Sequence, residues 1–107
     1  MNENLMIIER KINEIVQKLL IPIRVEKTID KEAFDLFYCY LDELVKIIEG
    51  KELIPRKLAG LLFYIYVTLI SEIEIDNYKN PIFMEAAKLE GYLDRILWDS
   101  PFGNLND

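Results

Sequence analysis

The stretch LAGLLFYIYVTLI, residues Leu58–Ile70, contains no charged side chain, and its clearly polar member is Thr68. Such a run must be shielded from water, because burial of apolar surface is the dominant favourable contribution to folding. A helix needs about 20 mostly apolar residues to cross a bilayer, whereas runs of about 10–14 residues are typical of buried helices. Arg56 and Lys57 precede the run and Glu72 follows it, so we expect a core segment of a soluble protein rather than a membrane span.

This core segment is predicted to be the third of four helices. Pro55 suits the first position of a helix, so the helix is expected to run from Pro55 to about Ile73. The letters FYIYVTLI within it also favour a β-strand, but a single strand of this length would be unusual. Because the segment is apolar on all sides, we expect it to be the central helix, covered by the others.

The first predicted helix spans about Glu3–Leu20 and has one narrow apolar stripe. Its apolar residues alternate steps of three and four, which is typical of a helix packed along one side. The stripe consists of Leu5, Ile8, Ile12, Ile15 and Leu19. Pro22 is predicted to end this helix, because proline removes a backbone hydrogen bond from a helix interior. Ile21–Thr28 is then expected to be an extended connection.

Two further amphipathic segments complete the pattern. Asp30 is a favourable N-cap and Gly50 a favourable C-terminal stop, so the second helix is expected to span these residues. Asn80 and Pro81 are expected to begin the fourth helix as its cap and first residue. The tail, residues 98–107, contains helix-breaking residues and is expected to be partly ordered.

These four segments predict an all-α fold. Residues 1–107 are expected to form a single helical domain, a four-helix antiparallel bundle (up-down or irregular) with the third helix central. Short strands remain an alternative at Ile21–Val25 and Ser71–Ile75, where β-branched residues are frequent.

The composition excludes several classes of function. The chain has 13 basic and 19 acidic residues, no histidine and one cysteine, Cys39. Nucleic acids and anionic membranes are bound mainly through basic side chains, so neither is an expected partner. Without histidine, Ser-His-Asp and Cys-His catalysis and histidine-containing metal sites are excluded. We expect no enzyme activity, catalytic residue, cofactor or metal, and the absence of a signal-peptide pattern predicts a cytoplasmic protein.

Acidic residues gather in two segments that together predict a contact surface. Residues 30–52 hold seven acidic and three basic side chains, and residues 71–94 hold six acidic and two basic ones. The charges of the third helix also oppose its dipole, since Arg56 and Lys57 lie at its start and acidic residues lie at its end. Either neighbouring helices or a basic partner protein must compensate them. The candidate partner-binding residues are Asp35, Asp42, Glu43, Glu72, Glu74 and Asp76, with Tyr38 and Tyr92 as aromatic contacts.

The leading hypothesis is a small acidic module that binds a basic protein. In size, acidity, helical content and lack of catalytic groups the chain is similar in general character to colicin-type immunity proteins. That resemblance implies an immunity or antitoxin-type inhibitor of a bacterial toxin, for instance a nuclease. Two alternatives remain open. The Leu5–Leu19 stripe has heptad spacing and could pair with a second copy in a homodimer. Helical carboxylates could instead hold magnesium in a MazG-like enzyme acting on phosphorylated substrates.

Overall fold

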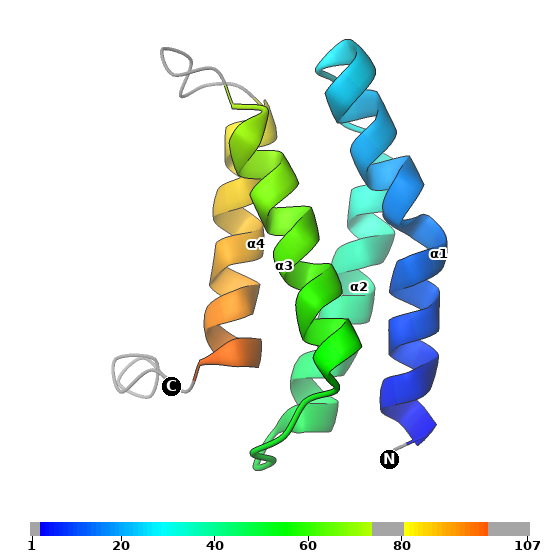
Figure 1. Cartoon of the computed structure of the whole chain (residues 1–107), viewed down its shortest axis with the longest axis vertical. Coiled ribbons are helices and arrows are strands. Elements are labelled where there is room, and N and C mark those ends of the chain that lie inside the picture. Colours follow the sequence, from blue (N-terminus) through cyan, green and yellow to red (C-terminus); the bar gives the residue numbers. More distant parts are fainter. Residues whose placement is uncertain (1–2, 74–80, 99–107) are drawn as a thin grey trace.

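The computed structural model describes residues 3–73 and 81–98, and these form four helices (Figure 1). The helices are α1 (Glu3–Glu26), α2 (Lys31–Ile48), α3 (Arg56–Ser71) and α4 (Pro81–Leu97). The described ranges contain no strand, which confirms the all-α prediction. Ile21–Val25 is helical, and the expected strand Ser71–Ile75 begins within the last residue of α3 and extends beyond the described residues.

Each helix packs mainly against two of the others. The helix α1 packs against α2 and α3, and α4 packs against α3 and α2. Figure 1 shows that consecutive helices run in opposite directions. The neighbours α1 and α3 therefore run in the same direction, and so do α2 and α4. Around the bundle the order is α1, α2, α4, α3, so the connection from α2 to α3 crosses one end of the bundle diagonally.

The core is formed by the inner side of each helix. Its largest fully buried side chains are Phe34 and Phe37 of α2, joined by leucines and isoleucines from all four helices. All five residues of the apolar stripe on α1 are buried there, as are Leu58, Leu62, Ile65 and Leu69 of α3. The α1 stripe is therefore used inside the protein and is not free to pair with a second copy.

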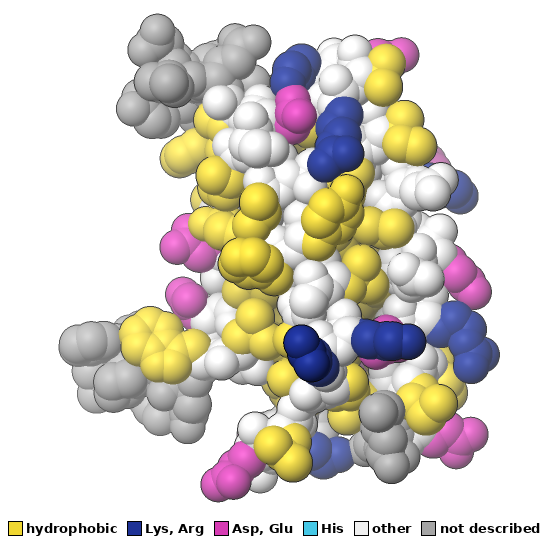
Figure 2. Space-filling view, in the orientation of Figure 1, with side chains coloured by type: hydrophobic (Ala, Val, Ile, Leu, Met, Phe, Trp, Pro, Cys, Tyr) yellow, Lys and Arg dark blue, Asp and Glu magenta, His cyan; other side chains and the backbone are white. Residues whose placement is uncertain are grey.

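The prediction that α3 is a central, fully covered helix is wrong. Four of its apolar side chains are exposed, namely Phe63, Tyr64, Val67 and Ile70. A helix with two principal neighbours presents one side to solvent, and on α3 this side is also apolar. Figure 2 shows the resulting gathering of hydrophobic side chains along α3. No helix in the described ranges is long and apolar enough to span a membrane.

The prediction that Pro22 ends the first helix is also wrong. The helix α1 continues through Pro22 to Glu26, because Leu19 and Ile23 on either side of the proline are fully buried. Burial of an aliphatic side chain contributes about 1.5–3 kcal/mol, and two such side chains outweigh the cost of about 3 kcal/mol for an internal proline. The helix ends instead where Lys27 adopts a left-handed conformation, with φ of 57°.

The caps of α2 confirm the prediction made from Asp30 and Gly50. The Asp30 carboxylate accepts a hydrogen bond of 3.1 Å from the backbone N–H of Ala33, which satisfies one of the free donors of the first turn. Gly50 follows the helix with φ of 76°, a conformation that favours glycine. The third helix begins at Arg56 rather than Pro55, which occupies the cap position without a side-chain hydrogen bond.

Replacing Pro22 by alanine is expected to stabilise the protein. Alanine at this position can donate the missing backbone hydrogen bond to the carbonyl of Lys18, and it removes the steric conflict of the proline ring. We expect the free energy of unfolding to rise by about 1–2 kcal/mol, measured by urea denaturation. A lower unfolding midpoint would show that the proline ring contributes packing that exceeds its backbone cost.

Candidate functional site

Two tyrosines stack at the interface between α2 and α4. The rings of Tyr38 on α2 and Tyr92 on α4 lie 5.4 Å apart with an interplanar angle of 12°. Both side chains are buried, with 4% and 9% of their surface exposed. The helical positions of the two residues place them at the edge of the core, where the rings pack together and the hydroxyl groups require partners.

Each tyrosine hydroxyl donates a hydrogen bond to a carboxylate on the opposite helix. The Tyr38 hydroxyl lies 2.6 Å from Oε2 of Glu85 and 3.2 Å from the Glu85 backbone carbonyl oxygen. The Tyr92 hydroxyl lies 2.7 Å from Oδ1 of Asp42. We call these four residues the tyrosine–carboxylate seam. Because the hydroxyls are on buried rings, the carboxylates they contact are held in fixed positions.

The acidity of both tyrosines reflects this arrangement. Burial raises the pKa of Tyr38 far above its ordinary value, and the hydrogen bond to Glu85 raises it further. Burial also raises the pKa of Tyr92, followed by the hydrogen bond to Asp42 and the Asp42 charge, while Arg95 acts in the opposite direction. Both hydroxyls are therefore held in the protonated form that donates to a carboxylate.

Two cations of α4 lie over the outer faces of the seam. The Lys88 ammonium is 4.3 Å from the centre of the Tyr38 ring, and the Arg95 guanidinium is 4.8 Å from the centre of the Tyr92 ring. These contacts attract the cations to the rings. Neither Asp42 nor Glu85 forms an ion pair within the described ranges, where Lys88 and Arg95 contact the aromatic rings instead.

The comparisons with known proteins give no further guide to this site. No protein-family model, curated protein or solved structure matches this chain. Within residues 3–73 and 81–98, no cluster of three or more Asp, Glu or Cys side chains could hold a metal ion. What the seam offers is a pair of positioned hydrogen-bond acceptors carrying negative charge, which suits a cationic side chain of a partner.

The structure brings together some of the predicted contact residues. Tyr38, Asp42 and Tyr92 meet in the seam. Asp35 is exposed on the same helix, close enough for its charge to help raise the pKa of Tyr38. Glu85 completes the group and was absent from the predicted contact residues. Its role depends on α2 and α4 being neighbours, which no local sequence pattern reports.

Other predicted contact residues lie elsewhere. Glu43 lines an open groove between α1 and α2, together with Lys11 and Lys46. Glu72 at the end of α3 forms an ion pair with Lys27 of α1, so a neighbouring helix compensates one of the charges that oppose the α3 dipole. Glu74 and Asp76 lie outside the described residues.

The two tyrosines differ from their predicted role as aromatic contacts on the surface. Their rings are buried between α2 and α4, and they act on the surface only through the carboxylates that they hold. Cys39 is exposed on the outer side of α2, one turn after Asp35, in an acidic neighbourhood that disfavours the reactive thiolate.

Proposed function

We propose that this protein is an acidic binding module that holds a basic partner protein against the α2–α4 surface. The observation that carries the proposal is the fixed position of two carboxylates, Asp42 and Glu85, each hydrogen-bonded to a buried tyrosine of the opposite helix. With the exposed Asp35 they form what we call the acidic face. A carboxylate that is held in place before binding loses less side-chain freedom when it meets a lysine or arginine.

The charges of the chain favour the same kind of partner. The formal net charge of −6 attracts a basic protein over distance and raises the rate of encounter. At the acidic face, hydrogen bonds between carboxylates and cationic side chains would be about twice as strong as neutral ones. Lys88 and Arg95 border the face. They would repel the cations of partners that do not align these cations with the carboxylates.

In its most concrete form the proposal is an immunity or antitoxin-type inhibitor of a bacterial toxin, such as a nuclease. A nuclease needs basic side chains to bind phosphates, and an acidic protein that covers them would block its substrate. Small size, acidity and an all-α fold support this form of the proposal. The proposed place of action is the bacterial cytoplasm.

The test compares capture of proteins from cell extract by two variants of equal charge. The variant Asp35→Asn with Asp42→Asn removes two charges from the acidic face, and asparagine can still accept the Tyr92 hydrogen bond. The control, Glu9→Gln with Glu14→Gln, removes two charges from α1. We expect wild type and control to capture the same basic protein, and the face variant to bind it at least about tenfold more weakly.

Identical capture by all three proteins would remove the basis of the proposal, as would a captured partner with an acidic contact surface. Melting curves of the variants verify that the fold is retained. Once the partner is purified, its affinity should fall steeply with salt, because exposed charge pairs are screened. No feature of the described residues favours the magnesium enzyme, since Asp42 and Glu85 are engaged by tyrosines.

A further inference from the structure

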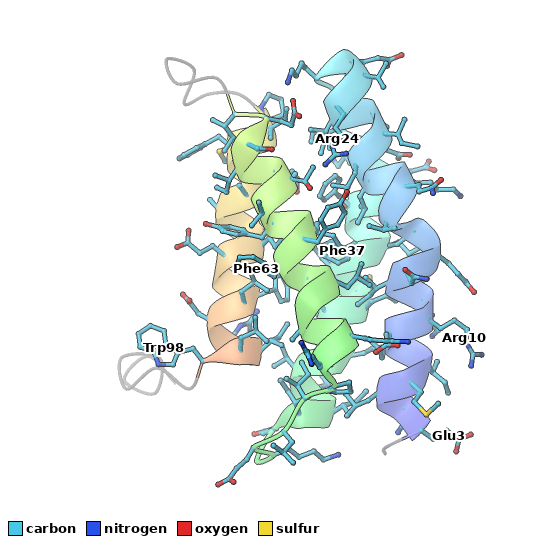
Figure 3. The ribbon with its side chains drawn as sticks, in the orientation of Figure 1. Glu3, Arg10, Arg24, Phe37, Phe63 and Trp98 are labelled. Carbon is cyan, nitrogen blue, oxygen red and sulfur yellow. The ribbon has the colours of Figure 1, made fainter. Side chains whose placement is uncertain are left out.

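The outward side of α3 carries an apolar stripe that is not buried in the core of the bundle. Phe63, Val67 and Ile70 are 61%, 43% and 45% exposed. Together with Gly60 they follow steps of three and four residues, the spacing of a helix that packs against another helix. We call these four residues the outer stripe. Figure 3 shows Phe63 on α3, on the side away from Phe37 in the core, and Figure 2 shows the hydrophobic surface along the helix.

Gly60 in the outer stripe is not explained by packing inside the protein. A Cβ atom at this position would meet nothing within 4 Å, and the residue is exposed in the second turn of α3. Glycine in a helix interior costs about 0.5–1 kcal/mol relative to alanine. A small residue on an outer helix face permits another backbone or a large side chain to approach closely.

The charges at the start of α3 point to an antiparallel neighbour. Arg56 and Lys57 are exposed at the positive end of the helix dipole, where each cation is unfavourable by about 0.3–1 kcal/mol. Within the described residues neither forms an ion pair. A second helix running in the opposite direction would place its negative end beside these two cations.

We propose that two copies of this chain associate through the outer stripe, with the two α3 helices antiparallel about a two-fold axis. A stripe centred between Phe63 and Val67 places Phe63 of one subunit against the partner subunit's Val67. The same register places Gly60 against the partner subunit's Ile70, so the smallest residue of the stripe receives a large one. Arg56 and Lys57 then lie beside the end of the partner's α3.

A second copy accounts for these features better than an unrelated protein. A two-fold interface uses one patch twice, so the patch must be complementary to itself. The outer stripe is complementary to itself in shape, because it has a small residue near one end and a large residue near the other. It is also complementary to itself in charge, because two cations lie at one end of α3 and the negative end of the helix dipole lies at the other. An unrelated partner would require neither relation.

The dimer leaves the acidic face free. The helices α2 and α3 lie diagonally across the bundle, so association through α3 directs the seam of each subunit outward. A single exposed stripe on one helix is narrow compared with the roughly 800 Å² that each partner of a standard stable complex buries, so we expect a reversible dimer with a Kd in the micromolar range. This inference is independent of the proposed function.

Sedimentation equilibrium on the full chain tests the dimer over about 10–500 μM, a range that covers micromolar Kd values. The apparent molecular mass of the wild-type protein is expected to rise with concentration from the monomer mass of 12.7 kDa toward twice this value. Val67→Glu buries an unpaired charge in the proposed interface and should raise the Kd at least about 100-fold. The control Met84→Glu places the same charge on an exposed apolar position of α4 and should leave the Kd unchanged.

Disulfide cross-linking tests the register. In a Cys39→Ser background, a mixture of chains carrying Gly60→Cys and chains carrying Ile70→Cys should yield the mixed cross-linked dimer, and Gly60→Cys alone should not cross-link. A monomer at every concentration would overturn the proposal, and so would equal effects of Val67→Glu and Met84→Glu. Cross-linking of Gly60→Cys alone would show parallel pairing and overturn the proposed geometry.

Discussion

Replacing Phe37 by alanine is expected to lower the free energy of unfolding by about 3–5 kcal/mol. The side chain is fully buried and contacts two other rings. It meets Phe34 edge to face, at 6.3 Å and 81°, and Tyr38 at 5.6 Å. A single domain is stable by about 5–15 kcal/mol in total, so the loss brings the protein close to unfolding. Urea denaturation followed by circular dichroism measures it.

Phe63→Ala is the matched control, since it removes the same ring from an exposed position of α3. At about 1 μM protein, below the range of about 10–500 μM over which the dimer is tested, we expect the free energy of unfolding to change by less than about 0.5 kcal/mol. In Figure 3 the Phe37 side chain lies between the helices, whereas the Phe63 side chain lies on the other side of α3. Equal losses from the two substitutions would contradict the assignment of inner and outer faces.

The inner face of α2 could be predicted from the sequence because short-range rules determine it. Phe34 and Phe37 belong to an apolar stripe of helical period, and Asp30 and Gly50 mark its limits. Capping and periodicity act within a few residues, and they need no knowledge of the other helices.

The end of α1 and the exposure of α3 could not be predicted in this way. At Pro22 a local backbone cost competes with burial of Leu19 and Ile23 against other helices, and only the assembled bundle decides the outcome. In α3 the apolar residues Phe63 and Val67 look like core residues in the sequence. Which of the apolar sides faces inward depends on the positions of the neighbouring helices.

The seam was predictable only in part. Tyr38 and Tyr92 fit the apolar stripes poorly in the sequence, and Asp42 lies in a segment rich in acids. The hydrogen bonds that connect them require α2 beside α4 and parallel to it. An up-down bundle with consecutive helices as neighbours would separate these residues, so the partners of the tyrosines follow from the order of packing.

The seam also predicts how the protein responds to alkali. The pKa of Tyr38 is near 10 in the unfolded chain and is raised in the folded protein, so the folded state holds its proton where the unfolded state releases it. The stability that Tyr38 contributes is complete below about pH 10 and is lost as the pH rises toward the folded pKa. The loss is about 1.4 kcal/mol per pH unit above 10.

Tyr38→Phe is therefore expected to reverse its effect with pH. At pH 7 the variant lacks a hydrogen bond to a carboxylate and should be less stable than wild type by about 1–2 kcal/mol. Phenylalanine does not ionise, so the variant avoids the alkaline loss. The two stability curves should cross near pH 11, measured by urea denaturation at each pH.

The crossing separates a role of the hydroxyl from a role of the ring. All other side chains are the same in the two proteins, so the difference between the curves isolates Tyr38. Tyr64→Phe, which removes a hydroxyl from an exposed ring of α3, is the control and should follow wild type throughout. If Tyr38→Phe instead stayed parallel to wild type from pH 7 to about 12, the hydroxyl would not be held protonated by burial and by Glu85. The hydrogen bond to Glu85 on which the acidic face depends would then be contradicted, because a buried hydroxyl that donates to a carboxylate resists ionisation.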